Sequence, residues 1–186
     1  MARALKIAGA PPPRLRNPGF ATLLRIIVDQ QVSVQAGAAI WKKLQTGLGT
    51  VNVKRVRACD EDTLRGFGLS RGKAHYAKGL ADAVADRSLN LKALVDADDD
   101  SVRDQLIEIK GIGRWTAEIY LMFALGRGDV WPAGDLALAV AAERLLDLDR
   151  RPSPVELDKI AESWRPYRTS AAVLLWHYYR AISQRS

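Results

Sequence analysis

A lone aspartate, Asp135, follows the stretch VWPAG and precedes LALAVAAERLL. Asp is a favoured residue at the start of a helix, because its side chain accepts hydrogen bonds from the unpaired N–H groups there, and Pro132 fits such a start. A carboxylate in this position is held in a fixed place beside the positive helix end. The structural role is therefore compatible with a chemical one, in which the carboxylate stabilises a positive charge or activates a water molecule.

The cysteine and the two histidines have no partner at a spacing that predicts a metal or catalytic site. Cys59 is the single cysteine, which excludes an internal disulfide and a cysteine-ligated iron–sulfur cluster. His75 and His177 have no carboxylate or cysteine at ligand spacing, which argues against a histidine-based metal site. We therefore expect that no cofactor is required.

A glycine turn lies about twenty residues before Asp135, in LIEIKGIGRWTAEI. Gly111 and Gly113 can adopt positive φ without a steric penalty, and Ile112 between them can enter the core. The stretch predicts helix, turn, helix, with the second helix beginning at about Arg114. The first N–H groups of that helix have no partner within it, and together with the positive helix end they suit a phosphate.

Residues around this turn add charge and further polar groups. Lys110 and Arg114 flank it, and Thr116 follows within the first turn of the second helix. The carbonyl groups of Ile109 and Gly111 are candidates to hold a monovalent cation, Na⁺ or K⁺, that bridges to the same phosphate. A helix–hairpin–helix of this kind grips the DNA backbone without reading sequence. The alternative is an ordinary corner between two helices with a glycine turn.

Charge and composition favour the DNA-binding interpretation. The chain has 186 residues, with 28 Lys and Arg against 21 Asp and Glu, which gives a formal charge of +7. A basic domain of this kind is typical of proteins that bind a polyanion, although a generally basic soluble protein has the same composition. The sequence has neither an apolar run of about 18 residues nor a signal-peptide pattern. We expect a soluble protein of the cytoplasm, associated with the nucleoid if the source is bacterial, with no membrane partner.

Helical periodicity runs through the chain and predicts an all-α fold of eight to ten short helices. Apolar residues recur with helical spacing in two clear cases: Phe20, Leu23, Leu24 and Ile27, and Leu157, Ile160, Ala161 and Trp164. The stretch SPVE places Ser153 before a helix and Glu156 three residues later, which predicts a capping box.

Four segments in this order resemble the helix–hairpin–helix base-excision DNA glycosylase superfamily, and most of all its 3-methyladenine-DNA glycosylase II group. They are GIGRWTA (residues 111–117), IIVDQQVSVQAGAAIWKKL (26–44), LRGFGLSRGKAHYAKGLA (64–81) and SWRPYRTSAAVLLW (163–176). In that group the catalytic Asp lies 20 residues beyond the tryptophan, which is the spacing from Trp115 to Asp135. The resemblance covers nearly the whole chain. It implies one glycosylase core, residues 1–186, with a bilobed fold: residues 20–127 contain the hairpin, and 128–186, joined by 1–19, carry Asp135.

The resemblance also implies roles for individual residues. Asp135 corresponds to the catalytic residue. Gln31 corresponds to the wedge, the side chain that fills the gap left by an extruded nucleotide. The alternative is that Gln30 and Gln31 are simply a polar helix end. Trp115 and Trp176 match positions of the base pocket, with core packing as the alternative, and Tyr120 and Trp131 are weaker pocket candidates. An electron-poor alkylated purine would gain from stacking on such rings.

Two departures from the superfamily sharpen the expectation. Members with lyase activity carry a Lys where this chain has Trp115, so no amine is available for a Schiff base and strand cleavage is not expected. We also expect no room in this chain for the N-terminal β-containing domain of the longer members.

The resemblance therefore implies a monofunctional glycosylase acting on double-stranded DNA. It would flip out alkylated purines, chiefly 3-methyladenine with 7-methylguanine as a further candidate, and work as a monomer. Two alternatives stay open: the same fold excising uracil, hypoxanthine or ethenoadenine, and a non-catalytic helix–hairpin–helix module that only binds DNA.

Overall fold

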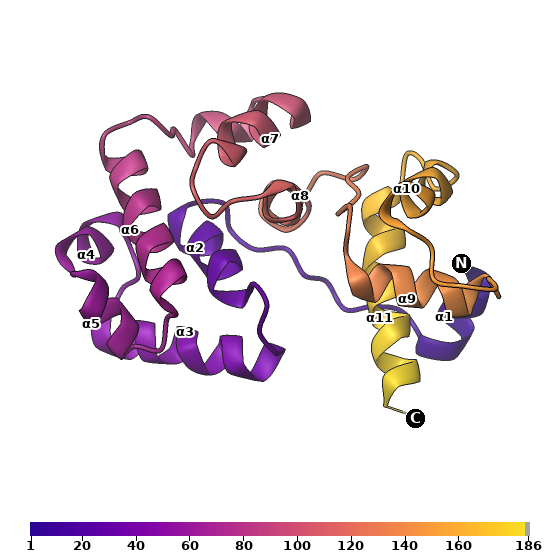
Figure 1. The fold of residues 1–186 in the computed structure, drawn as a ribbon. Coiled ribbons are helices and arrows are strands. Elements are labelled where there is room, and N and C mark those ends of the chain that lie inside the picture. Colours follow the sequence, from indigo (N-terminus) through magenta and orange to yellow (C-terminus); the bar gives the residue numbers. More distant parts are fainter. Residues whose placement is uncertain (185–186) are drawn as a thin grey trace. The chain divides into compact units, whose positions relative to one another are not determined.

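All regular secondary structure among residues 1–184, which the computed structural model describes, is helical (Figure 1). Eleven α-helices and one short 3-10 helix form in these residues, and the predicted all-α class is confirmed. The number exceeds the eight to ten helices expected from periodicity. The reason is that α1 (Ala2–Ala8), α4 (Val53–Ala58) and α5 (Glu61–Gly66) have only six or seven residues, too few to display an apolar stripe.

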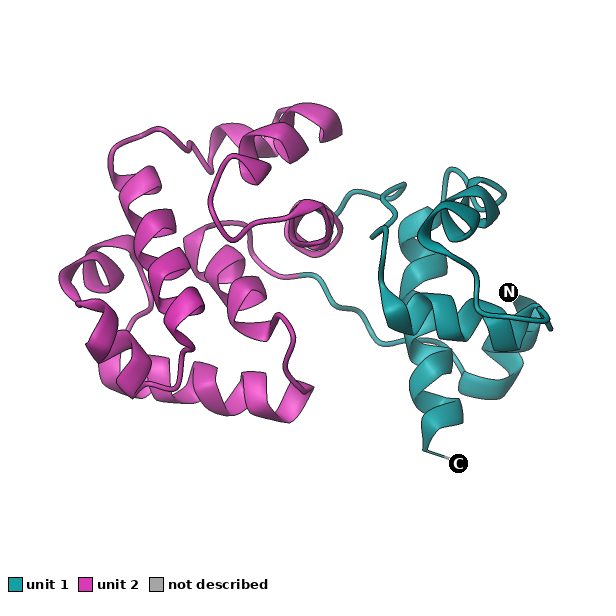
Figure 2. Cartoon of the chain, viewed as in Figure 1, with its two compact units in different colours: residues 1–15, 126–186 teal, residues 16–125 magenta. Residues whose placement is uncertain are grey.

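Contacts along the chain divide it into two compact units, residues 16–125 and residues 1–15 with 126–186 (Figure 2). The glycine turn of residues 111–113 belongs to the first unit, and Asp135 belongs to the second. Each of the two features singled out in the sequence is therefore positioned by the helices of its own unit.

The unit of residues 16–125 is organised around α2 (Phe20–Asp29), which packs against α3, α6 and α8. The stripe expected from the sequence faces the core: Leu23, Leu24 and Ile27 are fully buried and Phe20 is nearly so. The other helices of this unit, besides α4 and α5, are α3 (Val34–Leu48), α6 (Arg71–Ala85), the 3-10 helix η1 (Ala93–Val95), α7 (Asp99–Ile107) and α8 (Arg114–Phe123).

The unit of residues 1–15 and 126–186 is organised around α11 (Arg168–Ser183). Helix α9 (Leu136–Leu145) and helix α1 pack against it, and α10 (Pro154–Glu162) packs against α9. Small side chains permit the close approach of α9 and α11, since Ala141, Ala142 and Ala172 are all fully buried. Among the described residues, none of the helices has both the length and the apolarity needed to cross a membrane.

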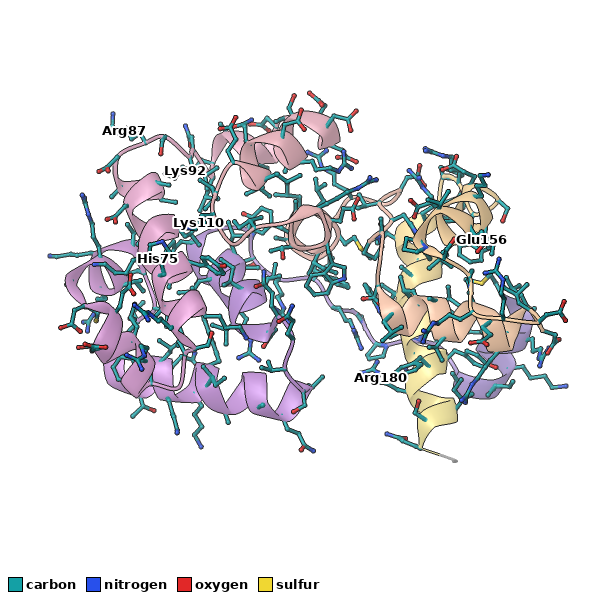
Figure 3. All side chains as sticks on the ribbon, viewed as in Figure 1. His75, Arg87, Lys92, Lys110, Glu156 and Arg180 are labelled. Atoms are coloured by element: carbon teal, nitrogen blue, oxygen red, sulfur yellow. The ribbon has the colours of Figure 1, made fainter. Side chains whose placement is uncertain are left out.

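The capping box predicted for α10 is confirmed. The Ser153 hydroxyl accepts a hydrogen bond from the Glu156 N–H (3.3 Å), and the Glu156 carboxylate accepts one from the Ser153 N–H (2.8 Å). Arg150 adds two further hydrogen bonds to the Glu156 carboxylate, at 2.7 and 3.0 Å. Glu156 lies at the start of α10 (Figure 3). The hydrogen bonds from Arg150, followed by those from Ser153, lower the pKa of Glu156 from 4.5 to about 2.

This carboxylate gives a prediction for acid stability. A carboxyl group whose pKa is lowered in the folded state stabilises the fold at pH values above its unfolded pKa, here 4.5, and loses that contribution as the pH falls through about 2. Glu156→Gln should therefore lower the melting temperature at pH 7, even though Gln can still complete the capping box. The difference from wild type should shrink steadily below pH 4.5. Thermal unfolding of both proteins between pH 7 and pH 3 measures it, with Glu143→Gln on α9 as the control for losing one negative charge. A difference that stays constant over this range would contradict the prediction.

Candidate active site and helical hairpin

Asp135 is the N-cap of α9, as its sequence context predicts. Its Oδ1 atom accepts a hydrogen bond from the Leu138 N–H at 3.0 Å, which is the capping interaction. The preceding residue, Gly134, has φ of 78°, a left-handed conformation that turns the chain into the helix. Asp135 is half-buried, so the residue is anchored at the start of α9 without being enclosed in the core.

Trp176 of α11 makes a second hydrogen bond to the same oxygen of Asp135. Its indole Nε1–H donates to Oδ1 at 3.1 Å, and the ring is half-buried. Sequence analysis assigned Trp176 to a base pocket, and the structure brings it to the candidate catalytic carboxylate. The 41 residues that separate the two positions leave no local signal for this hydrogen bond. Two N–H donors on different helices therefore fix the orientation of Asp135.

The other aromatic candidates lie in different environments. Trp115 is the second residue of α8 and is half-buried. Tyr120 is fully buried, and its hydroxyl accepts a hydrogen bond from the Gly19 N–H at 2.9 Å. Trp131 is only 5% exposed, with its ring centroid 5.4 Å from that of Trp164. Tyr120 and Trp131 thus differ from the expectation: both are core residues of their units, because their rings fill space between helices.

The hairpin has the form that the sequence predicts, with α7 ending at Ile107 and α8 beginning at Arg114. Gly111 has φ of 93°, and Ile112 is 3% exposed, so its side chain enters the core. Gly113 has φ of −92°, so only one of the two glycines uses a left-handed conformation. Gly113 is exposed, and a Cβ added to it would meet nothing within 4 Å. Its lack of a side chain therefore leaves the backbone at the start of α8 open to a close-approaching ligand.

Positive side chains flank the hairpin. Lys110 is exposed on the loop between α7 and α8 (Figure 3). The Arg114 side chain is 62% exposed, and its Nε–H donates to Glu118 Oε1 at 3.0 Å. Glu118 is 1% exposed and also lies 3.7 Å from Arg103 Nε. Glu118 was not among the predicted site residues, although its four-residue spacing from Arg114 is a recognisable signal for an ion pair on a helix. The hydrogen bond to Glu118 fixes the direction of the Arg114 side chain, and much of that side chain stays exposed.

Gln30, at the end of α2, ties the hairpin to the rest of its unit. Its side-chain Nε2 donates to the Gly111 carbonyl at 3.0 Å and to the Thr116 hydroxyl at 2.8 Å. Thr116, predicted from the sequence to contact the DNA backbone, is only 2% exposed, so its side chain does not face solvent. The reason is that Gln30 and Thr116 satisfy each other inside the unit. Thr116 can contribute to a phosphate site only through its backbone N–H.

The candidate cation ligands each accept one hydrogen bond. The Ile109 carbonyl accepts from the Ile112 N–H at 2.9 Å, and the Gly111 carbonyl accepts from Gln30. A carbonyl oxygen has two lone pairs, so each retains one for a cation. The hairpin is thus compatible with a bound Na⁺ or K⁺, which stays a prediction.

Gln31, the predicted wedge, is exposed and has φ of 52°. A left-handed conformation is uncommon outside glycine and is generally retained where the surroundings enforce it. It lies between the end of α2 and Ser33, which caps α3 through a hydrogen bond from the Ala36 N–H. The side chain of Gln31 therefore projects from a short, defined turn between two helices.

Two arginines near Asp135 were not singled out in the sequence. A surface depression of this unit is lined by Asp135 and Leu136 from the start of α9 and by residues 150–154. Arg150 is held by Glu156, whereas Arg151 is exposed beside it. The pair of adjacent arginines in DRRPSP could have indicated a site for a phosphate near the carboxylate.

Residues 24–166 match the HhH-GPD superfamily of base excision DNA repair proteins. The matched range includes the hairpin and Asp135 and leaves out Trp176.

Individual relatives agree with the family match. The chain is 30% identical to the alkylbase DNA glycosidase-like protein mag2 of Schizosaccharomyces pombe, over 88% of this chain and 79% of that protein. It is 31% identical to DNA-3-methyladenine glycosylase 1 of the same organism, over 84% of this chain and 71% of that protein. Among solved structures, the S. pombe 3-methyladenine DNA glycosylase Mag1 in complex with abasic DNA superposes with a TM-score of 0.85 at 29% identity. That superposition covers 94% of this chain and 88% of Mag1.

Proposed function

Since the chain belongs to the HhH-GPD superfamily of base excision DNA repair proteins, we propose that it is a monofunctional DNA glycosylase that removes alkylated purines from double-stranded DNA. The observation that carries the proposal is the setting of Asp135. One carboxylate is fixed by a helix N–H and an indole N–H while part of the residue is exposed. The names of relatives at 30% and 31% identity support the same reaction and substrate class.

The proposed reaction hydrolyses the bond between the base and C1′ of the deoxyribose. An alkylated purine carries a positive charge, so the bonding electrons leave with the base and neutralise it. The sugar then resembles an oxocarbenium ion, which the Asp135 carboxylate stabilises. A water molecule attacks C1′ and gives up its proton, with Asp135 orienting that water or accepting the proton. A cationic base does not need protonation to leave, so a single carboxylate is sufficient.

The hairpin supplies the DNA-binding part of the proposal. The positive N-terminal end of α8, the open side of Gly113 and the charges of Lys110 and Arg114 suit a DNA phosphate. A Na⁺ or K⁺ ion on the carbonyls of Ile109 and Gly111 would complete the phosphate site.

Base flipping requires a wedge and a pocket, and we assign these to exposed and half-exposed side chains. Gln31 would fill the gap left by the flipped nucleotide. Trp115 and Trp176 would stack on the electron-poor base, with 3-methyladenine as the main substrate and 7-methylguanine as a further one. Trp176 would then have two roles, because it also orients Asp135. We expect the protein to act as a monomer, in the compartment that contains DNA.

Release of bases from defined substrates tests the proposal. Duplex DNA treated with a methylating agent is incubated with the protein, and the released bases are separated by chromatography. Duplex oligonucleotides with one uracil, hypoxanthine or ethenoadenine are tested in parallel. Half of each oligonucleotide sample receives hot alkali, which cleaves abasic sites, and the other half detects lyase nicking. Release of methylated purines without nicking is expected. Release of only another base would reassign the substrate, and DNA binding without any release would identify a binding module.

A further inference from the structure

The carboxyl end of α2 is held by a lysine from another helix. Lys73, on the first turn of α6, donates from Nζ to the Val28 carbonyl at 2.7 Å and to the Gln30 carbonyl at 2.6 Å. The last carbonyls of a helix have no partner within it, so an ammonium group that satisfies two of them defines where the helix stops. Lys73 is half-buried, and burial lowers its pKa while the nearby Asp29 carboxylate acts in the opposite direction.

Gln30 is consequently held from two directions. Its backbone carbonyl accepts from Lys73, and its side chain donates to Gly111 and Thr116 of the hairpin. Gln31 follows directly, in a left-handed conformation with an exposed side chain. The backbone that carries the wedge is therefore attached both to α6 and to the hairpin, and Lys73 supplies the attachment to α6.

We propose that Lys73 is a positioning residue for base extrusion, which holds the turn after α2 so that Gln31 is directed into the DNA when the hairpin grips the backbone. This inference rests on the proposed function, since it concerns the step in which a glycosylase removes a base from the stack. Lys73 itself contacts only carbonyl groups of the protein, so its effect on the reaction passes through Gln31.

Substituting a lysine that only stabilises the fold should not affect base extrusion. Lys78 is such a lysine and is a matched control for Lys73. Lys78 lies five residues later on the same helix and donates from Nζ to the Arg57 and Cys59 carbonyls, at 2.6 and 2.8 Å. It holds the end of α4 in the way that Lys73 holds the end of α2. Loss of either ammonium group removes two hydrogen bonds to helix-end carbonyls, but only Lys73 is adjacent to the predicted wedge.

The test compares Lys73→Met with Lys78→Met on two substrates. One duplex has the damaged base paired normally, and the other has the same base unpaired in a bulge, where extrusion costs less. Single-turnover excision rates are measured with saturating protein, and the result is the ratio of the paired to the unpaired rate. Lys73→Met should lower this ratio about tenfold relative to wild type, because a poorly directed wedge matters most for a stacked, paired base. Lys78→Met should leave the ratio at the wild-type value.

Two further variants make the result specific. Gln31→Ala should lower the ratio in the same way, and adding Lys73→Met to it should cause no further loss, since both changes act through one side chain. Lys73→Gln, whose amide is too short to reach both carbonyls, should reproduce the effect if Lys73→Met melts below the assay temperature.

The outcomes separate the inference from the proposed function. If wild type excises the base but Lys73→Met and Lys73→Gln change both rates equally, as Lys78→Met does, the positioning role is rejected and the glycosylase assignment stands. If wild type excises neither the paired nor the bulged base, the proposed function itself fails, and the positioning role is rejected with it.

Discussion

Asp135→Asn is expected to slow base excision by a factor on the order of 10²–10³ while leaving the protein folded. Asn is as good an N-cap as Asp, and its side-chain oxygen can still accept from the Leu138 N–H and the Trp176 indole. The substitution therefore removes the negative charge and little else. Single-turnover excision of a methylated purine from duplex DNA measures the loss, and a thermal unfolding curve checks the fold.

A matched substitution elsewhere isolates the chemical role. Asp60 caps α5 by accepting from the Thr63 N–H at 2.7 Å, and it belongs to the other unit. Asp60→Asn makes the same chemical change at a helix start and should excise bases at the wild-type rate. Full activity in a folded Asp135→Asn protein would show that Asp135 is only a cap and would remove the basis of the mechanism.

Gly111→Ala should destabilise the protein by about 2–5 kcal/mol. A Cβ in the left-handed conformation costs about 1–2 kcal/mol, and forcing an atom into a packed neighbour typically costs about 1–3 kcal/mol. At Gly111, where φ is 93°, the new Cβ would lie 2.2 Å from Cγ of Tyr76. That atom is close to the backbone of α6, so the ring cannot swing away cheaply. Urea denaturation followed by circular dichroism gives the change in the free energy of unfolding.

Gly113→Ala is the matched control for Gly111→Ala. It has an ordinary φ and open space for a Cβ, so the loss of stability should stay below about 1 kcal/mol. A methyl group at this exposed position should nevertheless weaken DNA binding if a phosphate approaches the backbone there, which fluorescence anisotropy with a labelled duplex measures. Replacing Tyr76 by Ala in the Gly111→Ala protein should recover the part of the penalty that comes from the clash. Equal destabilisation by the two glycine substitutions would refute the explanation.

Local sequence patterns predicted the features that depend on neighbours in the chain. The cap at Asp135, the capping box of Ser153 and the turn at Gly111 each need residues within a few positions of one another. The all-α class followed from apolar spacing for the same reason. Very short helices such as α4 and α5 were not predicted, because six residues are too few to show a repeating apolar pattern.

Local sequence patterns do not predict contacts between segments that are far apart in the chain. The family resemblance implied a stacking role for Trp176, but its hydrogen bond to Asp135 joins two helices and has no local signal. Gln30 was considered only as a polar helix end and Lys73 was not singled out, because their contacts form only when α2, α6 and the hairpin are packed together. Thr116 was predicted to contact the DNA backbone, yet its side chain is buried and accepts a hydrogen bond from Gln30 at the end of a distant helix.

Asp135 caps α9 and would also carry the reaction, so a substitution there can remove activity without unfolding the protein. Substitutions of Asp135 by other capping residues, such as Asn, Ser or Thr, would keep α9 and the surrounding unit intact. Quality control removes unfolded chains, so such inactive proteins would accumulate to normal levels. They would still bind DNA through the hairpin and take up damaged bases with Gln31, Trp115 and Trp176, and so would cover damaged sites without completing repair. Losing this one charge would thus be more harmful than losing the protein, because the variant would compete with any other enzyme for the same lesions.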